Sequence, residues 1–383
     1  MFFQAKKIKT ILLSKKMSQR PIPKSGILKI DIYVPGRTKA PKGIKTIKLS
    51  SNESPLGASE KAIEAYKDIA DNLATYPDGS SKNLREALAE TYNIKAENIV
   101  IGAGSDELLH LLAQTYLGEN DKALINEYGF LVYPIVTKGA GATIKTAKAN
   151  NYKADVDALL KAITPDTKII FLDNPNNPCG TYLSANELER LHNGMRKDIL
   201  LVIDSAYAHY VNAKDYNAGI ELVEKNENVV MVQTFSKIGL AALRLGWLYG
   251  SPHIVDALNR LRGPFNVNMA AQAAGIATLK DKDFIKNLVA HNEKWRAWLT
   301  KELASNRLQI LPSQGNFILA LFPDETGLSA KKADETLLKH GLVTRRVEAY
   351  GLPNALRISI GDEQAMQKVA KVLKVFIKEN SDV

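Results

Sequence analysis

Short apolar runs alternate with amphipathic segments over residues 73–250, and this alternation constrains the fold more than any other feature. The runs that are expected to be strands cover residues 98–101, 122–125, 143–146, 168–172, 199–203 and 229–233. Apolar residues recur at helical spacing between them, as at 108–116, 156–162 and 187–196. Continuous apolar runs such as 199–203 are typical of parallel strands buried on both faces. We therefore predict an α/β domain with a mostly parallel sheet between helices.

The pattern changes after Pro264. A long helix is expected over residues 283–303, strands over 316–321 and 355–360, and an amphipathic helix over 366–377. This segment predicts a smaller α+β region at the C-terminus.

Charge and composition exclude several classes of protein. Residues 1–30 hold eight lysines and arginines and no acid, whereas the whole chain has a net charge of +10, so the folded body is nearly neutral and does not indicate a nucleic-acid binder. The basic leader suggests a targeting segment, a membrane-surface helix or a disordered extension before Met17; we favour the extension.

No stretch approaches the ~20 apolar residues that span a membrane. The single cysteine, Cys179, excludes an internal disulfide and a Cys-based zinc site; we expect no metal and a cytoplasmic location.

Polar or ionisable residues follow four of the predicted strands. Gly104-Ser105-Asp106 follows one, residues 174–180 follow a second, Asp204 ends a third, and Ser236-Lys237 follows a fourth. Ligands of open α/β sheets bind at the carboxyl ends of strands. The sequence therefore predicts a binding site at this edge.

Two of these residues suit covalent catalysis, Lys237 as a nucleophile and Asp204 as the partner of a cofactor. A lysine near desolvating walls, as Lys237 would be, can attack carbonyl groups, although an isolated lysine is more often a surface residue. Asp204 closes an apolar strand, where an acid is costly unless it is paired. It suits a cofactor with a pyridine nitrogen, or else caps the following helix. The hydroxyl of Tyr207 could reach the same ligand.

One of the remaining strand ends can bind an anion, and the other is followed by a rigid turn. The glycine-rich turn at residues 102–107 offers free N–H groups to a phosphate, to which Ser236 and Arg244 would add a hydroxyl and a charge. Prolines and Gly180 stiffen residues 174–180, so that one asparagine amide can face a ligand.

These strings together resemble the fold-type I pyridoxal-phosphate-dependent aminotransferases. The chain looks more narrowly like the histidinol-phosphate aminotransferase family, and the resemblance covers about residues 30–377. The strings that carry it are the glycine turn, Asn174-Pro175-Asn176-Asn177-Pro178-Cys179-Gly180, Asp204-Ser205-Ala206-Tyr207, Ser236-Lys237, Arg244-Leu245-Gly246, and the segments 33–36, 51–57, 76–79, 350–353 and 356–358.

The resemblance implies the cofactor pyridoxal 5′-phosphate and a role for each matching residue. Lys237 would carry the cofactor as an imine and then move the substrate proton, while Asp204 keeps the pyridine nitrogen protonated. The other implied cofactor contacts are Tyr207 and Asn177 at the ring oxygen, Phe130 stacked on the ring with Tyr128 as its alternative, and Ser105, Asp106, Ser236, Arg244 and a second subunit's Tyr76 at the phosphate. The implied substrate contacts are Tyr33, Asn52, Arg345 and Arg357.

The resemblance also implies a homodimer and a division of the chain. Residues 1–29 would be a disordered leader, 30–72 an arm on the small domain and the dimer partner, 73–263 the large cofactor domain, and 264–383 the small domain.

The implied reaction interconverts L-histidinol phosphate plus 2-oxoglutarate and imidazole-acetol phosphate plus L-glutamate, in histidine biosynthesis. Its partners would be these small molecules, with no nucleic acid and no membrane. Arg345 and Arg357 favour a dianionic phosphate substrate, because guanidinium groups pair with phosphate in a bidentate way. An aromatic amino-acid aminotransferase is the alternative, and a phosphothreonine decarboxylase is less favoured.

The chain departs from the family pattern at three places, and the first of them keeps a different class open. The loop from Lys237 to Arg244 is one residue shorter than the family's, Cys179 replaces a threonine, and Ser205 replaces a glutamate or alanine. The shorter loop puts the reach of Arg244 in doubt. A protein that binds the cofactor poorly and acts as a binding or regulatory module is therefore a second hypothesis, and a basic nucleic-acid binder is a third.

Overall fold

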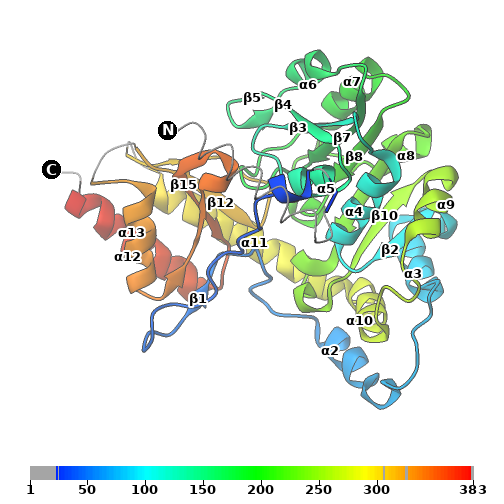
Figure 1. The fold of residues 1–383 in the computed structure, drawn as a ribbon. Coiled ribbons are helices and arrows are strands. Elements are labelled where there is room, and N and C mark those ends of the chain that lie inside the picture. The colour runs from blue at the N-terminus through cyan, green and yellow to red at the C-terminus, as the bar shows by residue number, and fades with distance from the viewer. Residues whose placement is uncertain (1–22, 25, 305–306, 324–326, 381–383) are drawn as a thin grey trace, which may run out of the picture.

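A computed structural model of the chain describes residues 23–24, 26–304, 307–323 and 327–380. Its large part is built on a seven-stranded sheet of order β2-β10-β9-β8-β7-β3-β4 (Figure 1). The strands are β2 (Ile99–Gly102), β3 (Lys122–Asn126), β4 (Thr143–Ala147), β7 (Thr167–Asp173), β8 (Leu200–Asp204), β9 (Val229–Thr234) and β10 (Gly246–Gly250). All run parallel except β10, which is antiparallel to both β2 and β9. The predicted α/β domain with a mostly parallel sheet is confirmed.

Helices cover both faces of this sheet. The helices on one face are α4 (Ser105–Tyr116), α5 (Val132–Gly139) and α9 (Pro252–Leu261). Those on the other are α3 (Lys82–Tyr92), α6 (Val156–Ala162), α7 (Ala185–Gly194), α8 (Ile220–Lys225) and α10 (Met269–Lys280). Along β8, Leu201 and Ile203 pack into the second core and Leu200 and Val202 into the first. Both faces are thus buried, which explains the continuous apolar run.

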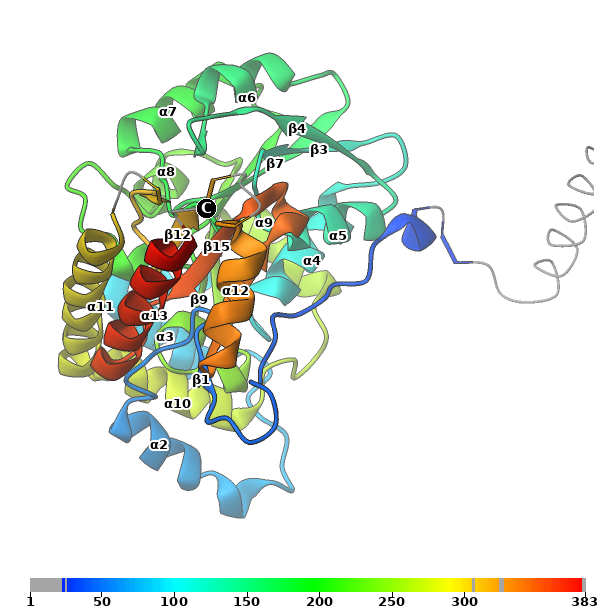
Figure 2. The same cartoon turned by 90° about the vertical axis from the view of Figure 1, so that its left-hand side faces the viewer.

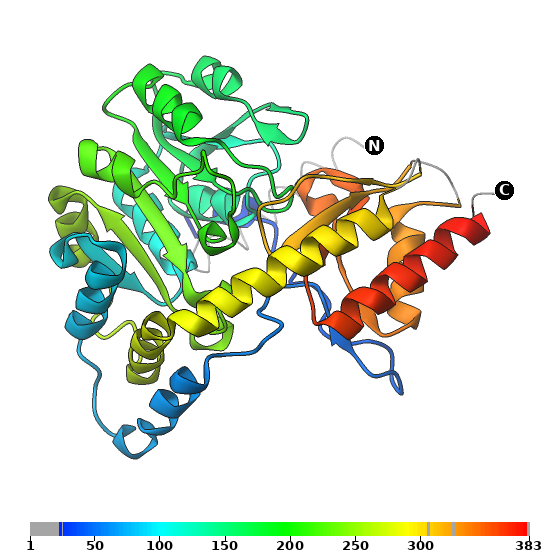
Figure 3. The same cartoon turned by 180° about the vertical axis from the view of Figure 1, so that it is seen from behind.

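The smaller part has its own antiparallel sheet, of order β11-β12-β15-β14. Its strands are β11 (Gln309–Ile310), β12 (Phe317–Leu321), β14 (Arg345–Val347) and β15 (Leu352–Ser359), and its helices are α11 (Lys282–Leu303), α12 (Ala330–Lys339) and α13 (Glu363–Asn380). The three helices lie side by side over this sheet (Figure 2). Helix α11 joins the two parts (Figure 3), since Leu288 packs in the large core and Leu299 in the small one.

The N-terminal segment touches both parts. Strand β1 (Ile47–Lys48) pairs in parallel with β13 (Leu342–Val343), whereas α2 (Glu60–Lys67) packs on α10. Helix α10 itself packs on α3 and contributes to the large core, although the sequence division assigned it to the small domain. We therefore propose that the two domains divide within α11.

The remaining strands are β5 (Ala149–Asn150) and β6 (Lys153–Ala154), a short hairpin. Most of the predicted leader, residues 1–22 and 25, lies outside the described residues. Within the described ranges no helix is both long and apolar enough to cross a bilayer.

Candidate active site

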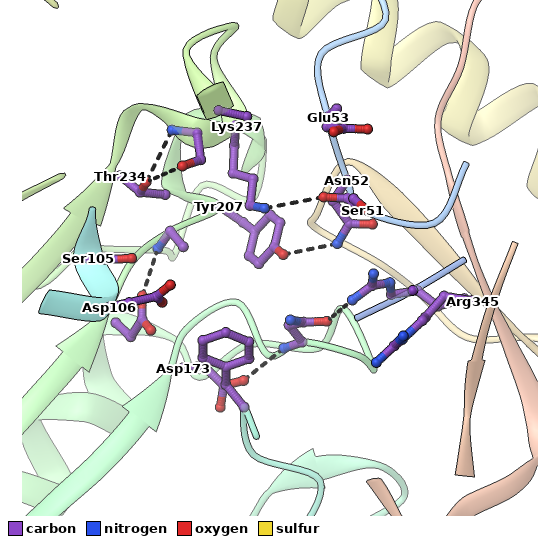
Figure 4. A pocket seen from close by; sticks show the side chains of 18 of the residues that line it. Ser51, Asn52, Glu53, Ser105, Asp106, Asp173, Tyr207, Thr234, Lys237 and Arg345 are labelled. Atoms are coloured by element: carbon purple, nitrogen blue, oxygen red, sulfur yellow. Dashed lines mark hydrogen bonds between the residues drawn. The ribbon is translucent and has the colours of Figure 1, made fainter. Parts of the chain in front are cut away.

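A cavity of about 330 Å³ lies where the large part, the small part and the N-terminal segment meet. This volume lies in the range of small-ligand pockets, roughly 300–1,000 Å³. Thirteen of the fourteen predicted site residues line it: Tyr33, Asn52, Ser105, Asp106, Phe130, Asn177, Asp204, Tyr207, Ser236, Lys237, Arg244, Arg345 and Arg357. Figure 4 shows the lysine side chain entering between the glycine turn and the N-terminal segment.

The sheet topology explains why these residues converge. The carboxyl ends of β2, β7, β8 and β9 lie at one edge because the strands run parallel. Strand β10 runs the opposite way, so its amino end lies at that same edge. Arg244 stands two residues before β10 begins and is therefore delivered to the site, although the loop that precedes it is short.

An anion cradle lies at the start of α4. Arg244 donates from Nη1 to Oγ of Ser236 at 3.2 Å and from Nη2 to Oδ2 of Asp106 at 3.2 Å. A Cβ added at Gly104 would lie 2.7 Å from Nη2 of Arg244, and one added at Gly246 would lie 2.4 Å from the backbone nitrogen of Ser105. Glycine thus allows a fixed cation and the free N–H groups of a helix start to face one point, an arrangement that fits a phosphate.

Lys237 lies beside this cradle. Its Nζ is 5.7 Å from the ring centroid of Tyr207 and donates a long hydrogen bond, 3.4 Å, to the carbonyl oxygen of Ser51. Burial, and then the positive charge of Arg357, lower the pKa of Lys237 to about 8. A larger share of this amine is therefore neutral near physiological pH than in an exposed lysine, as a nucleophile for a carbonyl requires.

Asp204 is buried at the end of β8. The hydroxyl of Tyr133 donates to its Oδ2 at 3.1 Å, and the backbone nitrogen of Ala206 donates to Oδ1 at 3.3 Å. Burial raises the pKa of Asp204 to about 6, although the bond from Tyr133 opposes that shift. The carboxyl is therefore mostly ionised above pH 7 and held in one orientation, as a partner for a protonated ring nitrogen must be.

A second group of side chains faces the cavity from the N-terminal segment and the small part. Asn52 donates from Nδ2 to the hydroxyl of Tyr207 at 2.9 Å. Arg357 is 6% exposed and donates to Oδ1 of Asn177 and, at 2.7 Å, to the carbonyl oxygen of Ser50. Its Nε is buried without a hydrogen-bond partner among the described residues. A buried guanidinium with an unpaired N–H suits an anionic ligand.

Tyr76 is the predicted residue that lies outside the cavity. It is 80% exposed and stacks on Phe265 with ring centroids 4.7 Å apart. Its reach into a second subunit stays a prediction. Of the two candidates for the stacking residue, Phe130 lines the cavity, whereas Tyr128 packs on Tyr152.

The sequence analysis missed several residues of the site. Tyr133 comes from a helix that tertiary packing brings under Asp204, and its sequence position carries no signal. Asp173 also lines the cavity, and burial raises its pKa to about 7. It could have been found, because it ends a buried strand, as Asp204 does.

Comparison with known proteins agrees with this geometry. The family of class I and II aminotransferases matches residues 44–373. A histidinol-phosphate aminotransferase of Nitrobacter winogradskyi is 50% identical over 360 residues, which cover 94% of this chain and 99% of that protein. One from Maricaulis maris is 50% identical over 357 residues, 93% of this chain and 99% of that protein. The crystal structure of the Sinorhizobium meliloti histidinol-phosphate aminotransferase in complex with pyridoxal 5′-phosphate is 26% identical and superposes with a TM-score of 0.82, covering 88% of this chain and 92% of that one.

Proposed function

The chain belongs to the class I and II aminotransferase family, and we propose that it transfers the amino group of L-histidinol phosphate to 2-oxoglutarate, giving imidazole-acetol phosphate and L-glutamate. The main support is that one cavity contains the anion cradle, Lys237 with its lowered pKa and the buried carboxyl of Asp204. The 50% identity to relatives with that name supports the substrate.

The residues of the cavity fit pyridoxal 5′-phosphate. When bound, this cofactor supplies an aldehyde carbon for the Lys237 amine and a ring that withdraws electrons from the substrate Cα. Ser105, Ser236 and Arg244 would hold its phosphate, and Asp204 would keep its ring nitrogen protonated. Phe130 would cover one face of the ring.

Different side chains of the cavity would perform the separate steps of amino transfer. Nζ of Lys237, freed when the substrate amine takes its place, would accept the proton from the substrate Cα and deliver it to the aldehyde carbon of the cofactor, because its lowered pKa suits both steps. The hydroxyl of Tyr207, oriented by Asn52, would donate a hydrogen bond to the ring oxygen. Arg357 and Arg345 would receive the phosphate of histidinol phosphate or the distal carboxylate of 2-oxoglutarate.

The test is a half-reaction followed by absorbance. Holoenzyme mixed with histidinol phosphate, without 2-oxoglutarate, should convert its cofactor to the amine form, and phenylalanine should do so more slowly. Faster conversion by phenylalanine would favour the aromatic amino-acid aminotransferase instead. The Lys237→Ala variant should lose the visible absorbance band of the lysine-bound cofactor. Wild-type protein that shows no such band after addition of pyridoxal 5′-phosphate would favour the binding-module hypothesis.

We further propose a homodimer and a cytoplasmic location. Large apolar side chains are exposed in the arm and near Tyr76, among them Ile32 at 90% and Leu73 at 83%. Such a surface is costly in water and suits a second copy of the chain.

A further inference from the structure

Asp173 is a second buried acid in the cavity, beside Asp204. It is 5% exposed and stands opposite Asp204 in the register of the parallel β7–β8 pair. Their side chains therefore leave the sheet on the same face, and both line the cavity. A buried acid is costly unless it is well hydrogen-bonded, and a neighbouring acid adds to the cost. The hydrogen-bond partners of Asp173 therefore indicate its role in the site.

Those partners all lie in the turn that follows β7. Oδ2 of Asp173 accepts a hydrogen bond from the backbone N–H of Asn177 at 2.8 Å. Both carboxyl oxygens accept from Nδ2 of Asn176, at 3.1 and 3.0 Å. Oδ1 of Asn176 in turn accepts from the backbone N–H of Cys179 at 2.9 Å. One carboxyl group thus fixes the backbone at Asn177 and, through Asn176, the rest of the turn.

The Asn177 side chain continues this chain of contacts across the cavity. Its Oδ1 accepts a hydrogen bond from Nη1 of Arg357, so that its NH₂ group is the part able to donate to a ligand. Arg357 is otherwise held by the carbonyl oxygen of Ser50. Any shift of Asn177 would therefore move an acceptor of the buried guanidinium as well as a donor to the ligand.

We propose that Asp173 is a positioning residue of this aminotransferase, which aims the Asn177 amide and, through it, the Arg357 guanidinium at the anionic end of the substrate. The inference rests on the proposed function for the assignment of that anion. If Asp173 only stabilised the turn, its loss would affect ligand binding independently of the Asn177 side chain. A positioning role requires the effect of Asp173 to pass through that side chain.

A double-mutant cycle separates these roles. The measured quantity is the dissociation constant of the holoenzyme for glutarate, which has the two carboxylates of 2-oxoglutarate without its keto group. Asp173→Ala and Asn177→Ala should each weaken binding on the order of tenfold, the effect of losing one buried hydrogen bond. The double variant should be no weaker than the poorer single variant. Asp173→Asn, which keeps an acceptor oxygen for the N–H of Asn177, should bind nearly as wild type does.

The controls keep the test decisive. Asp166→Asn changes a half-buried acid that is ion-paired with Lys122 just before the opposite end of β7, and it should leave glutarate binding unchanged. If Asp173→Ala does not fold, Asp173→Ser takes its place in the cycle, because the serine hydroxyl stands one bond short of the carboxyl oxygens that accept from Asn176 and Asn177. Effects that multiply in the double variant, or an Asp173→Ala protein that binds glutarate as wild type does, would overturn the proposal. Glutarate binding needs no turnover, so a failure of histidinol phosphate as substrate would leave this result readable.

Discussion

The two buried acids of the cavity, Asp173 and Asp204, are chemically alike but differ in their surroundings. Asp204 accepts from a tyrosine hydroxyl, and burial raises its pKa to about 6. Burial raises the pKa of Asp173 to about 7, and the negative charge of Asp204 adds to that rise. The partners of the two carboxyls also differ, because Asp173 accepts hydrogen bonds from the side chain of Asn176 and the backbone of Asn177. This matches a division in which Asp204 faces the cofactor nitrogen and Asp173 holds the turn.

Replacing Asp204 by asparagine should separate catalysis from stability. The amide still accepts from Tyr133 but cannot hold a proton on a ring nitrogen, so kcat should fall on the order of 10²–10⁴-fold. The unfolding free energy of the apoprotein in urea at pH 7.5 should be equal or higher, since a buried charge is removed. A variant that keeps full activity would contradict the assigned role, and an unfolded one would show that Asp204 is structural.

The Asp173→Asn variant should change the pH dependence of stability. The pKa of Asp173 is about 7 in the folded protein and near its ordinary value, 3.8, when unfolded. The folded state then binds more protons between these values, so the wild-type carboxyl loses stability as the pH rises through 7. Asparagine does not titrate. Relative to wild type, the variant should therefore gain about 1–3 kcal/mol between pH 5 and pH 8 in urea unfolding of the apoprotein.

The neighbouring acid must be kept out of this comparison. Repeating the measurement with Asp204→Asn in both proteins removes the other strongly shifted carboxyl of the cavity. A stability difference between the Asp173→Asn variant and its parent that does not change with pH would show that Asp173 is not protonated on folding.

At the scale of elements, the site depends on one strand that runs against the others. Strand β10 lies between β2 and β9, and its first residue, Gly246, opposes Gly102 on one side and Thr234 on the other. It therefore links the two strand ends that form the anion cradle. Its antiparallel direction also delivers Arg244 to the site.

A methyl group at the start of β10 should disturb the cradle. In Gly246→Ala the new Cβ would lie 2.4 Å from the backbone nitrogen of Ser105, so the turn before α4 must move. We expect a loss of roughly 1–3 kcal/mol in unfolding free energy. Weaker binding of pyridoxal 5′-phosphate in equilibrium dialysis should accompany it. The matched control is Gly263→Ala, whose Cβ would meet no heavy atom within 4 Å. Equal cofactor affinity in the two variants would argue against the close approach.

The parallel strands of the large sheet were predictable from the sequence, whereas its antiparallel strand β10 and the alanine-rich helix α10 were not. Buried parallel strands such as β8 are continuous apolar runs, which local sequence reveals. Strand β10 begins and ends with glycine, and its place depends on pairing with distant strands. Helix α10 is rich in alanine and apolar around much of its surface, so its pattern did not indicate which core it joins.

The same distinction applies to the site. Lys237 and Asp204 were predicted because each follows or ends an apolar strand, a position that local sequence shows. Asp173 satisfies the same rule and was overlooked beside the asparagine-proline turn. Tyr133 was not predictable, since only the packing of α5 brings its hydroxyl to Asp204.

At the scale of the whole molecule, the cavity is closed by three segments far apart in sequence. Its floor comes from the large sheet, one wall from the N-terminal segment around Asn52, and another from Arg357 in the small part. Asn316 of the small part donates to the carbonyl oxygen of Asn52 at 2.9 Å and so ties the two walls together. The proposed substrate contacts therefore require all three segments to be assembled.

A homodimer with Tyr76 reaching the partner's site predicts complementation between two defective chains. Tyr76 lies outside the cavity of its own chain and is 80% exposed, so it can serve a site only in another subunit. Lys237→Ala and Tyr76→Ala proteins, each weakly active alone, are unfolded together and refolded in equal amounts. Activity should rise to about a quarter of the wild-type value, because half of randomly paired dimers are hybrids and each hybrid has one complete site. Mixing without refolding, which prevents exchange when subunits dissociate slowly, is the control. Sedimentation of the mixture as a dimer without any gain in activity would show that Tyr76 does not complete the site of its partner.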